Sequence, residues 1–184
     1  MPIQVTNITI RLKMHCSDTF PTMSIKHLRR GCFVTHSKIS TCYPLIINVK
    51  YECIENFHHL FFTLAPDDKY IKYTMDKAMY LVDETGLAQY NTLKEKGFYN
   101  NIMGTSAVFS IYCDSINFDP QKMEFKYYGR QRIERRTSIL TRELVTAGQL
   151  KRVPRTDNNP HGLLIVNWRT LLNKDIEQKT KNNY

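Results

Sequence analysis

The protein has 184 residues, of which 42% are hydrophobic and 11% aromatic, and it carries a net charge of +9. A chain of this size and composition can bury a substantial core, which excludes a wholly disordered protein. No apolar run approaches the ~18 residues of a membrane-spanning helix, and the N-terminus lacks the apolar segment of a signal peptide, so neither feature is expected.

The first third of the chain shows mostly the period of β-strands. Residues 8–15 alternate between apolar and polar side chains, which predicts a half-buried strand. A short helix capped by Thr22 or Ser24 should follow, because Gly31 stands just after a basic last turn. Further strands are expected at 32–36, 45–54 and 57–64, the last two as parts of a hairpin or meander.

The period changes to that of helices after Pro66. Apolar residues such as Ile71, Met75 and Ala78 recur every three or four positions, which predicts a helix that ends at Gly86. Residues 87–97 predict a second, shorter helix that ends at Gly97.

Alternation returns in the last part of the chain. Strands are expected at 106–118 and 122–129, joined by a turn at Asp119 and Pro120, and a further strand at 162–172. The pattern of 130–147 fits either a helix or a strand, and 151–162 has the composition of a loop. These elements predict one mixed α+β domain over 1–172, mainly of antiparallel strands with a helical insert near 66–97, and a flexible C-terminal tail at 173–184.

Sequence motifs of common enzyme classes are missing. The chain has no glycine-rich phosphate loop, no G-x-S-x-G elbow and no H-E-x-x-H pair. Asp67 and Asp68 stand together at an expected helix start, where aspartate normally caps the helix. We therefore expect a protein that is not an enzyme and that needs no cofactor.

Cysteine and histidine residues crowd together over 15–42, as a zinc site would require. Their spacing contains no C-x₂₋₄-C or H-x₃₋₅-H pair, and His15 and Cys16 would point to opposite faces of a strand. We therefore expect no metal site, and an enzyme with a Cys/His pair stays only as a third hypothesis. Without a signal peptide the five cysteines should be reduced thiols in the cytosol or nucleus, with Cys53 and Cys113 in the core.

Positive charge is concentrated in three segments. Residues 120–155 hold ten Lys and Arg against three acidic residues, a net charge of +7. Arginine binds phosphate through two parallel hydrogen bonds, and Tyr127 and Tyr128 could act as stacking platforms beside the arginines. The alternative interpretations are a solvated face for 130–142, simple capping of a helix C-terminus for the basic residues of 26–30, and an exposed loop or a nuclear-import-like patch for those of 151–155. The candidate residues for binding phosphate or a lipid headgroup are Lys26, Arg29, Arg30, Arg130, Arg132, Arg135, Arg136, Arg142, Lys151, Arg152 and Arg155.

The segment "ITIRLKMHCSDTF" at 8–20, followed by a short helix and "GCFV" at 31–34, resembles the start of the globular domain of rhabdovirus matrix proteins. The chain lacks the P-P-x-Y and P-T-A-P motifs and the long basic arm of the animal-virus members, so it is more similar to the shorter proteins of plant-infecting members. The resemblance implies a structural protein that condenses the nucleocapsid, self-associates and touches the inner leaflet of the envelope.

These observations lead to one main hypothesis and one rival. We expect a matrix-type structural protein that bridges the nucleocapsid, or RNA, and an anionic membrane surface during virion assembly, as a homo-oligomer. Its location would be the virion and the host cytoplasm or inner membrane face, with the nucleus as an alternative. The rival is a viral RNA-binding accessory protein, such as a silencing suppressor or movement-related factor, which would use the same arginines on RNA.

Overall fold

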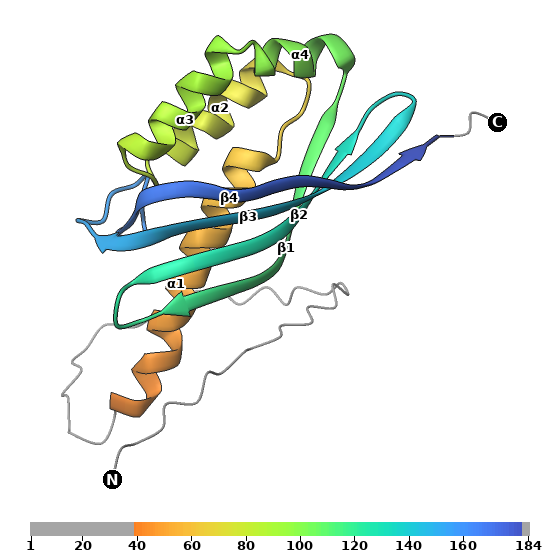
Figure 1. Ribbon diagram of the computed structural model, residues 1–184. Coiled ribbons are helices and arrows are strands. Elements are labelled where there is room, and N and C mark those ends of the chain that lie inside the picture. Colours follow the sequence, from red (N-terminus) through yellow and green to blue (C-terminus); the bar gives the residue numbers. More distant parts are fainter. Residues whose placement is uncertain (1–38, 182–184) are drawn as a thin grey trace, which may run out of the picture.

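The computed structural model describes residues 39–181, with side chains from residue 48 onward. In this part of the chain, helices come first and strands follow (Figure 1). The helices are α1 (Ile39–Phe62), α2 (Asp68–Met79), α3 (Glu84–Glu95) and α4 (Phe98–Thr105). The strands form one antiparallel sheet in the order β1 (Val108–Asp119), β2 (Glu124–Glu134), β3 (Ser138–Arg152) and β4 (Leu163–Thr180). The predicted α+β class with an antiparallel sheet is confirmed, and α2 and α3 occupy the predicted helical stretch near 66–97, although no described strand precedes them.

The long helix α1 occupies the segment for which two strands were predicted, 45–54 and 57–64. That prediction was wrong because alternation over a short apolar run also fits a buried helix face. The described buried side chains of α1 recur at the spacing of one helix face: Lys50, Cys53, Ile54, Phe57, His58 and Phe61.

The strands predicted at 8–15 and 32–36 and the short helix between them lie outside the described residues. The same holds for the side chains of the zinc candidate at 15–42.

The helical insert is divided more finely than predicted. Asp67 caps α2, as expected of an aspartate at this helix start, and its carboxylate accepts a hydrogen bond of 2.9 Å from the backbone N–H of Tyr70. The chain turns again before Gly86, because Asp83 caps a new helix, α3, by accepting a hydrogen bond from the N–H of Thr85. The end of α3 near Gly97 is confirmed, and the short helix α4 follows, which was not predicted.

The sheet is a meander of three consecutive antiparallel hairpins. The strands predicted at 106–118 and 122–129 are confirmed as β1 and β2, and the carboxylate of Asp119 accepts a hydrogen bond from the N–H of Gln121 in the turn between them. The ambiguous segment 130–147 continues β2 and begins β3, so it is strand rather than helix.

The C-terminal part of the sheet extends further than the sequence suggested. Residues 173–180, which were predicted to belong to a flexible tail, form the second half of β4 and pair with β3 from Leu144 to Ser138. Every side chain of β4 from Arg169 to Thr180 is exposed, so neither face of this half carries the buried pattern of a strand. Backbone pairing with β3 therefore determines its structure.

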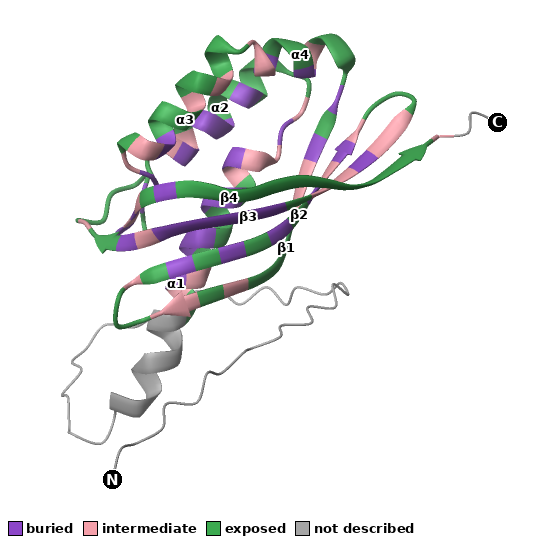
Figure 2. Ribbon diagram, in the orientation of Figure 1, coloured by how far each residue is buried: buried purple, intermediate pink, exposed green. Residues whose placement is uncertain are grey.

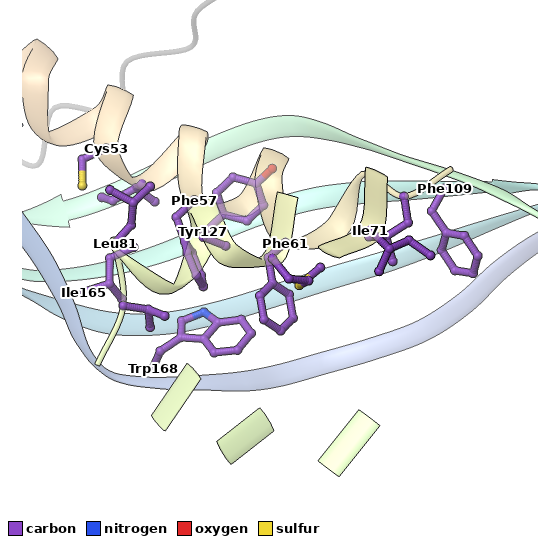
Figure 3. Close-up of a cluster of buried hydrophobic side chains, with 14 of the residues drawn as sticks. Cys53, Phe57, Phe61, Ile71, Leu81, Phe109, Tyr127, Ile165 and Trp168 are labelled. Atoms are coloured by element: carbon purple, nitrogen blue, oxygen red, sulfur yellow. The ribbon is translucent and has the colours of Figure 1, made fainter. Parts of the chain in front are cut away.

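The core lies between the helices and one face of the sheet, with α1 at its centre and with side chains of α2 and α4 also contributing (Figures 2 and 3). His58 of α1 stacks on Tyr127 of β2 with 3.8 Å between ring centroids, and the Trp168 ring of β4 lies edge to face with Phe57 at 5.1 Å. The α2–α4 layer is joined to β4, because Asp83 accepts a hydrogen bond from the N–H of Asn167. This packing leaves the other face of the sheet free of the described helices.

Gly129, on the core-facing side of β2, provides the space in which the Tyr127 ring lies. A Cβ at this position would come within 2.7 Å of the carbonyl oxygen of Tyr112 and of the Tyr127 ring. Gly129→Ala should therefore lower the free energy of unfolding by about 1–3 kcal/mol, as overpacking does, in urea titrations. Gly104→Ala in α4 is the matched control, because a Cβ there meets nothing within 4 Å, and it should be neutral or stabilising. Equal effects of the two changes would contradict this account.

Candidate functional site

The predicted basic residues do not gather on one face of the described molecule. Side chains alternate along β2, so Arg130 and Arg132 point away from α1, on what we call the outer face of the sheet. The strand register places Arg142 of β3 opposite Gln131 of β2, which is buried on the side that faces α1. Residues opposite each other in an antiparallel pair share a face, so Arg142 points to the core-facing side. Lys26, Arg29 and Arg30 lie outside the described residues.

The remaining candidates lie at opposite ends of the sheet. Arg135 and Arg136 are exposed in the turn between β2 and β3. Lys151 and Arg152 end β3, and Arg155 follows in the loop before β4. Since β3 rises by ~3.3 Å per residue, its two ends are roughly 45 Å apart. One phosphate group or lipid headgroup cannot contact both sets, and the binding of such groups stays a prediction for each set alone.

Three of the arginines form ion pairs within the sheet. Arg130 donates to both carboxylate oxygens of Asp114, which lies at the bulge of β1, and this contact raises the pKa of Arg130. Arg132 pairs with Glu134, and Arg142 pairs with Asp175 of β4. All three pairs are partly exposed, so each contributes at most about 1 kcal/mol to stability. The arginines therefore serve cross-strand and same-strand contacts, and are only partly available to a ligand.

The two tyrosines that were predicted as stacking platforms lie on different faces. Tyr127 is only 1% exposed and belongs to the core, whereas Tyr128 is 36% exposed on the outer face. Only Tyr128 could therefore contact a ligand on that face.

Rows of side chains cross the outer face at right angles to the strands. The strand registers place Tyr128 beside Val145 and Val145 beside Leu172, which makes an apolar row from β2 to β4. The neighbouring row runs from Lys126 through Ala147 to Arg169. We call these six residues the outer-face strip. This strip was not predicted from the sequence, although the alternation of Lys126, Tyr128, Arg130 and Arg132 was a usable signal.

A cavity of about 370 Å³ lies beside the solvent-facing side of α1. Partial desolvation of the thiol against its neighbours, and then the carboxylate of Glu55, raise the pKa of Cys113 to about 11 although the residue as a whole is exposed, so the thiol is protonated at neutral pH. Cys113 was predicted to lie in the core, but it is exposed, whereas Cys53 is buried as predicted. The lining residues are Glu52, Glu55, Asn56, His59, Ile111, Cys113, Tyr127 and His161.

Neither a metal site nor a membrane-spanning helix is present in the described part of the chain. Residues 39–181 contain no group of three or more His, Cys, Asp or Glu side chains placed to hold a metal ion. None of the helices in this range combines the length and the apolar character needed to cross a membrane.

Comparison with known proteins gives matches among solved structures only. No family model and no curated protein matches the chain. The structure of VirB8 from Agrobacterium tumefaciens has a TM-score of 0.58 at 7% identity, over 76% of this chain and 96% of that chain. TraE, in complex with 2-(2-furyl)isonicotinic acid, has a TM-score of 0.56 at 8% identity, over 68% and 96%. The soluble domain of TrwG, from the type IV secretion machinery of Bartonella grahamii, has a TM-score of 0.55 at 11% identity, over 78% and 98%.

This chain shares its fold with VirB8, TraE and TrwG. The resemblance to rhabdovirus matrix proteins is therefore wrong, and its residues at 8–20 and 31–34 lie outside the described part. An alternating strand followed by a helix is too common a pattern to identify a family. The matrix function, the RNA-binding alternative, and the location in a virion or host cell are wrong for the same reason, because the similar folds belong to bacterial proteins. Nucleocapsid, RNA and anionic membrane lose their support as partners.

Proposed function

We propose that the protein is a non-catalytic assembly component of a bacterial type IV secretion machinery. One observation carries this proposal: the chain matches 98% of the TrwG soluble domain, whose machinery is named, with a TM-score of 0.55. The match to VirB8 covers 96% of that chain, so the likeness extends over the complete arrangement of helices and sheet. The identity of 7–11% means that the support comes from the fold and from no shared site.

The chemistry of the described residues supports a role without catalysis. The Cys113 thiol has a raised pKa, which is the opposite of what an activated nucleophile needs. His58 is fully buried, with one ring nitrogen 2.6 Å from the carbonyl oxygen of Ile54 and the other 2.6 Å from the hydroxyl of Thr146. Neither group is both reactive and accessible, which supports a role in binding other proteins rather than in catalysis.

Self-association is part of the same proposal. Assembly components act in several copies or with several different partners, and the edge strands β1 and β4 and the outer face leave surface for such contacts. Sedimentation velocity of the purified chain over a range of concentrations should show a reversible increase in mass. A single monomeric species at all concentrations would remove self-association and leave hetero-assembly.

The function is tested in the bacterium that encodes the protein. Deleting the gene should abolish most secretion or transfer of substrate, and the wild-type gene should restore it. A tagged full-length chain should co-purify with identified components of a secretion machinery after cross-linking. Normal transfer in the deletion strain, together with no co-purifying machinery component, would reject the proposal.

A further inference from the structure

The outer-face strip is the part of the described surface where apolar and basic side chains meet in register. Tyr128 is 36% exposed and Leu172 is 37% exposed, on either side of the nearly covered Val145. The core and all four described helices lie on the opposite side of the sheet (Figure 1). The apolar row is thus accessible to a partner.

The two basic residues of the strip differ from the neighbouring arginines in their ion pairing. Arg130 and Arg132 are paired with Asp114 and Glu134. Lys126 and Arg169 form no ion pair with any residue of 39–181, and the residue between them is Ala147. A carboxylate from another molecule could therefore pair with either cation without displacing an internal partner.

The geometry points to one kind of occupant. We propose that the outer-face strip binds an amphipathic helix of a partner protein, lying across the strands with acidic residues along one edge. Tyr128 and Leu172 are two strand spacings apart, which is about 10 Å, and a helix rises by about 10 Å over seven residues. Apolar residues at i, i+3 or i+4, and i+7 of such a helix match the row Tyr128–Val145–Leu172. Carboxylates about seven residues apart then reach Lys126 and Arg169.

Two other occupants fit the charges less well. A nucleic acid needs a continuous positive track, but carboxylates interrupt this face, since Glu143 and Glu177 project from the same side as Arg130 and Arg132. In a contact of strip against strip, a second copy of the chain would bring Lys126 and Arg169 toward the same two cations of its own strip. An acidic helix meets the unpaired cations and covers the apolar row at the same time.

The test uses the purified full-length chain and synthetic peptides. The probe is a labelled helical peptide of about 18 residues, long enough to be helical, with leucines at i, i+4 and i+7 and glutamates along one edge. Fluorescence anisotropy should show saturable binding. The double variant Lys126→Glu/Arg169→Glu should weaken binding about tenfold, as expected for the loss of two exposed ion pairs. Leu172→Ser should weaken it as well, by removing the apolar contact.

Charge exchange separates recognition from a loss of folding. A peptide with lysines in place of the glutamates should bind the double variant better than it binds the wild type. The matched control is Lys69→Glu/Lys72→Glu on the exposed face of α2, which changes the net charge equally and should leave the affinity unchanged. Equal weakening by both double variants would mean that only net charge matters, and would overturn the proposal.

Competing occupants are tested in the same assay. Tighter binding of single-stranded DNA than of the peptide, lost in the same variants, would overturn the proposal in favour of nucleic acid. Self-association abolished by Leu172→Ser, without peptide binding, would replace the helix by a second copy. The binding assay contains only the purified chain and the peptide, so its result does not depend on the proposed secretion function. The proposal of a helix-binding strip and the proposal of a secretion component can therefore fail independently.

Discussion

Replacing Phe57 with alanine should lower the free energy of unfolding by about 3–5 kcal/mol, the largest effect expected of any truncation to alanine in α1. Phe57 is fully buried, and its ring lies 5.1 Å from that of Trp168 and 5.6 Å from that of Phe61, measured between centroids. These contacts join α1 to β4 across the core (Figure 3). The truncation would leave a cavity that the neighbouring rings cannot fill, and it should be measured by urea denaturation followed by circular dichroism.

The matched control for this prediction is Leu87→Ala in α3. Leu87 is 46% exposed and alanine favours a helix, so the change should alter stability by less than about 0.5 kcal/mol. A loss at Phe57 no larger than at Leu87 would show that α1 is not packed on the sheet as described. The size of the expected effect is a sizeable fraction of the whole stability of a domain, which is typically about 5–15 kcal/mol.

The helices and strands differed in how well the sequence predicted them. In β1 and β2, alternation and a turn at Asp119 agreed with each other, so both strands were found. In α1, Val49, Tyr51 and Cys53 also alternate, but the helix carries apolar residues on its flanks as well as on its buried face. A strand and a buried helix then produce similar short patterns, and only the longer spacing through Phe57 and Phe61 separates them.

The candidate surface was predicted less well than the fold. The run of arginines was visible in the sequence, but its division between two faces follows from the strand assignment, which was left open over 130–147. Arg142 and Arg132 are ten residues apart in the sequence, yet they point to opposite sides of the sheet. The sequence alone could not place Arg169 and Leu172 in the same strip as Lys126 and Tyr128. That placement depends on the register of β3 with β4, which no local sequence pattern specifies.

The second large effect concerns His58, the buried histidine of α1. The carbonyl oxygen of Ile54 can only accept, so Nδ1 of His58 carries the proton and donates at 2.6 Å. Nε2 is then unprotonated and accepts a hydrogen bond from the Thr146 hydroxyl at 2.6 Å. Thr146→Val would leave Nε2 buried without a partner, and should cost about 1–3 kcal/mol. The rings that surround His58 carry no charge, and the closest is that of Tyr127; the others are Phe57, Phe62, Phe125 and Trp168.

Acid should therefore unfold the protein through His58. Burial lowers the pKa of His58 to about 3 in the folded state, against 6.5 for an exposed histidine. Between these two values the unfolded chain binds the extra proton and the folded chain does not, so this stabilisation is complete above pH 6.5 and is lost as the pH falls toward 3. At about 1.4 kcal/mol per pH unit, stability at pH 5 should be about 2 kcal/mol lower than at pH 7.

Urea titrations across this range should show a much flatter pH dependence for His58→Gln. His59→Gln, at an exposed position next to it, should keep the wild-type slope, and equal slopes in all three proteins would show that His58 is not the group responsible.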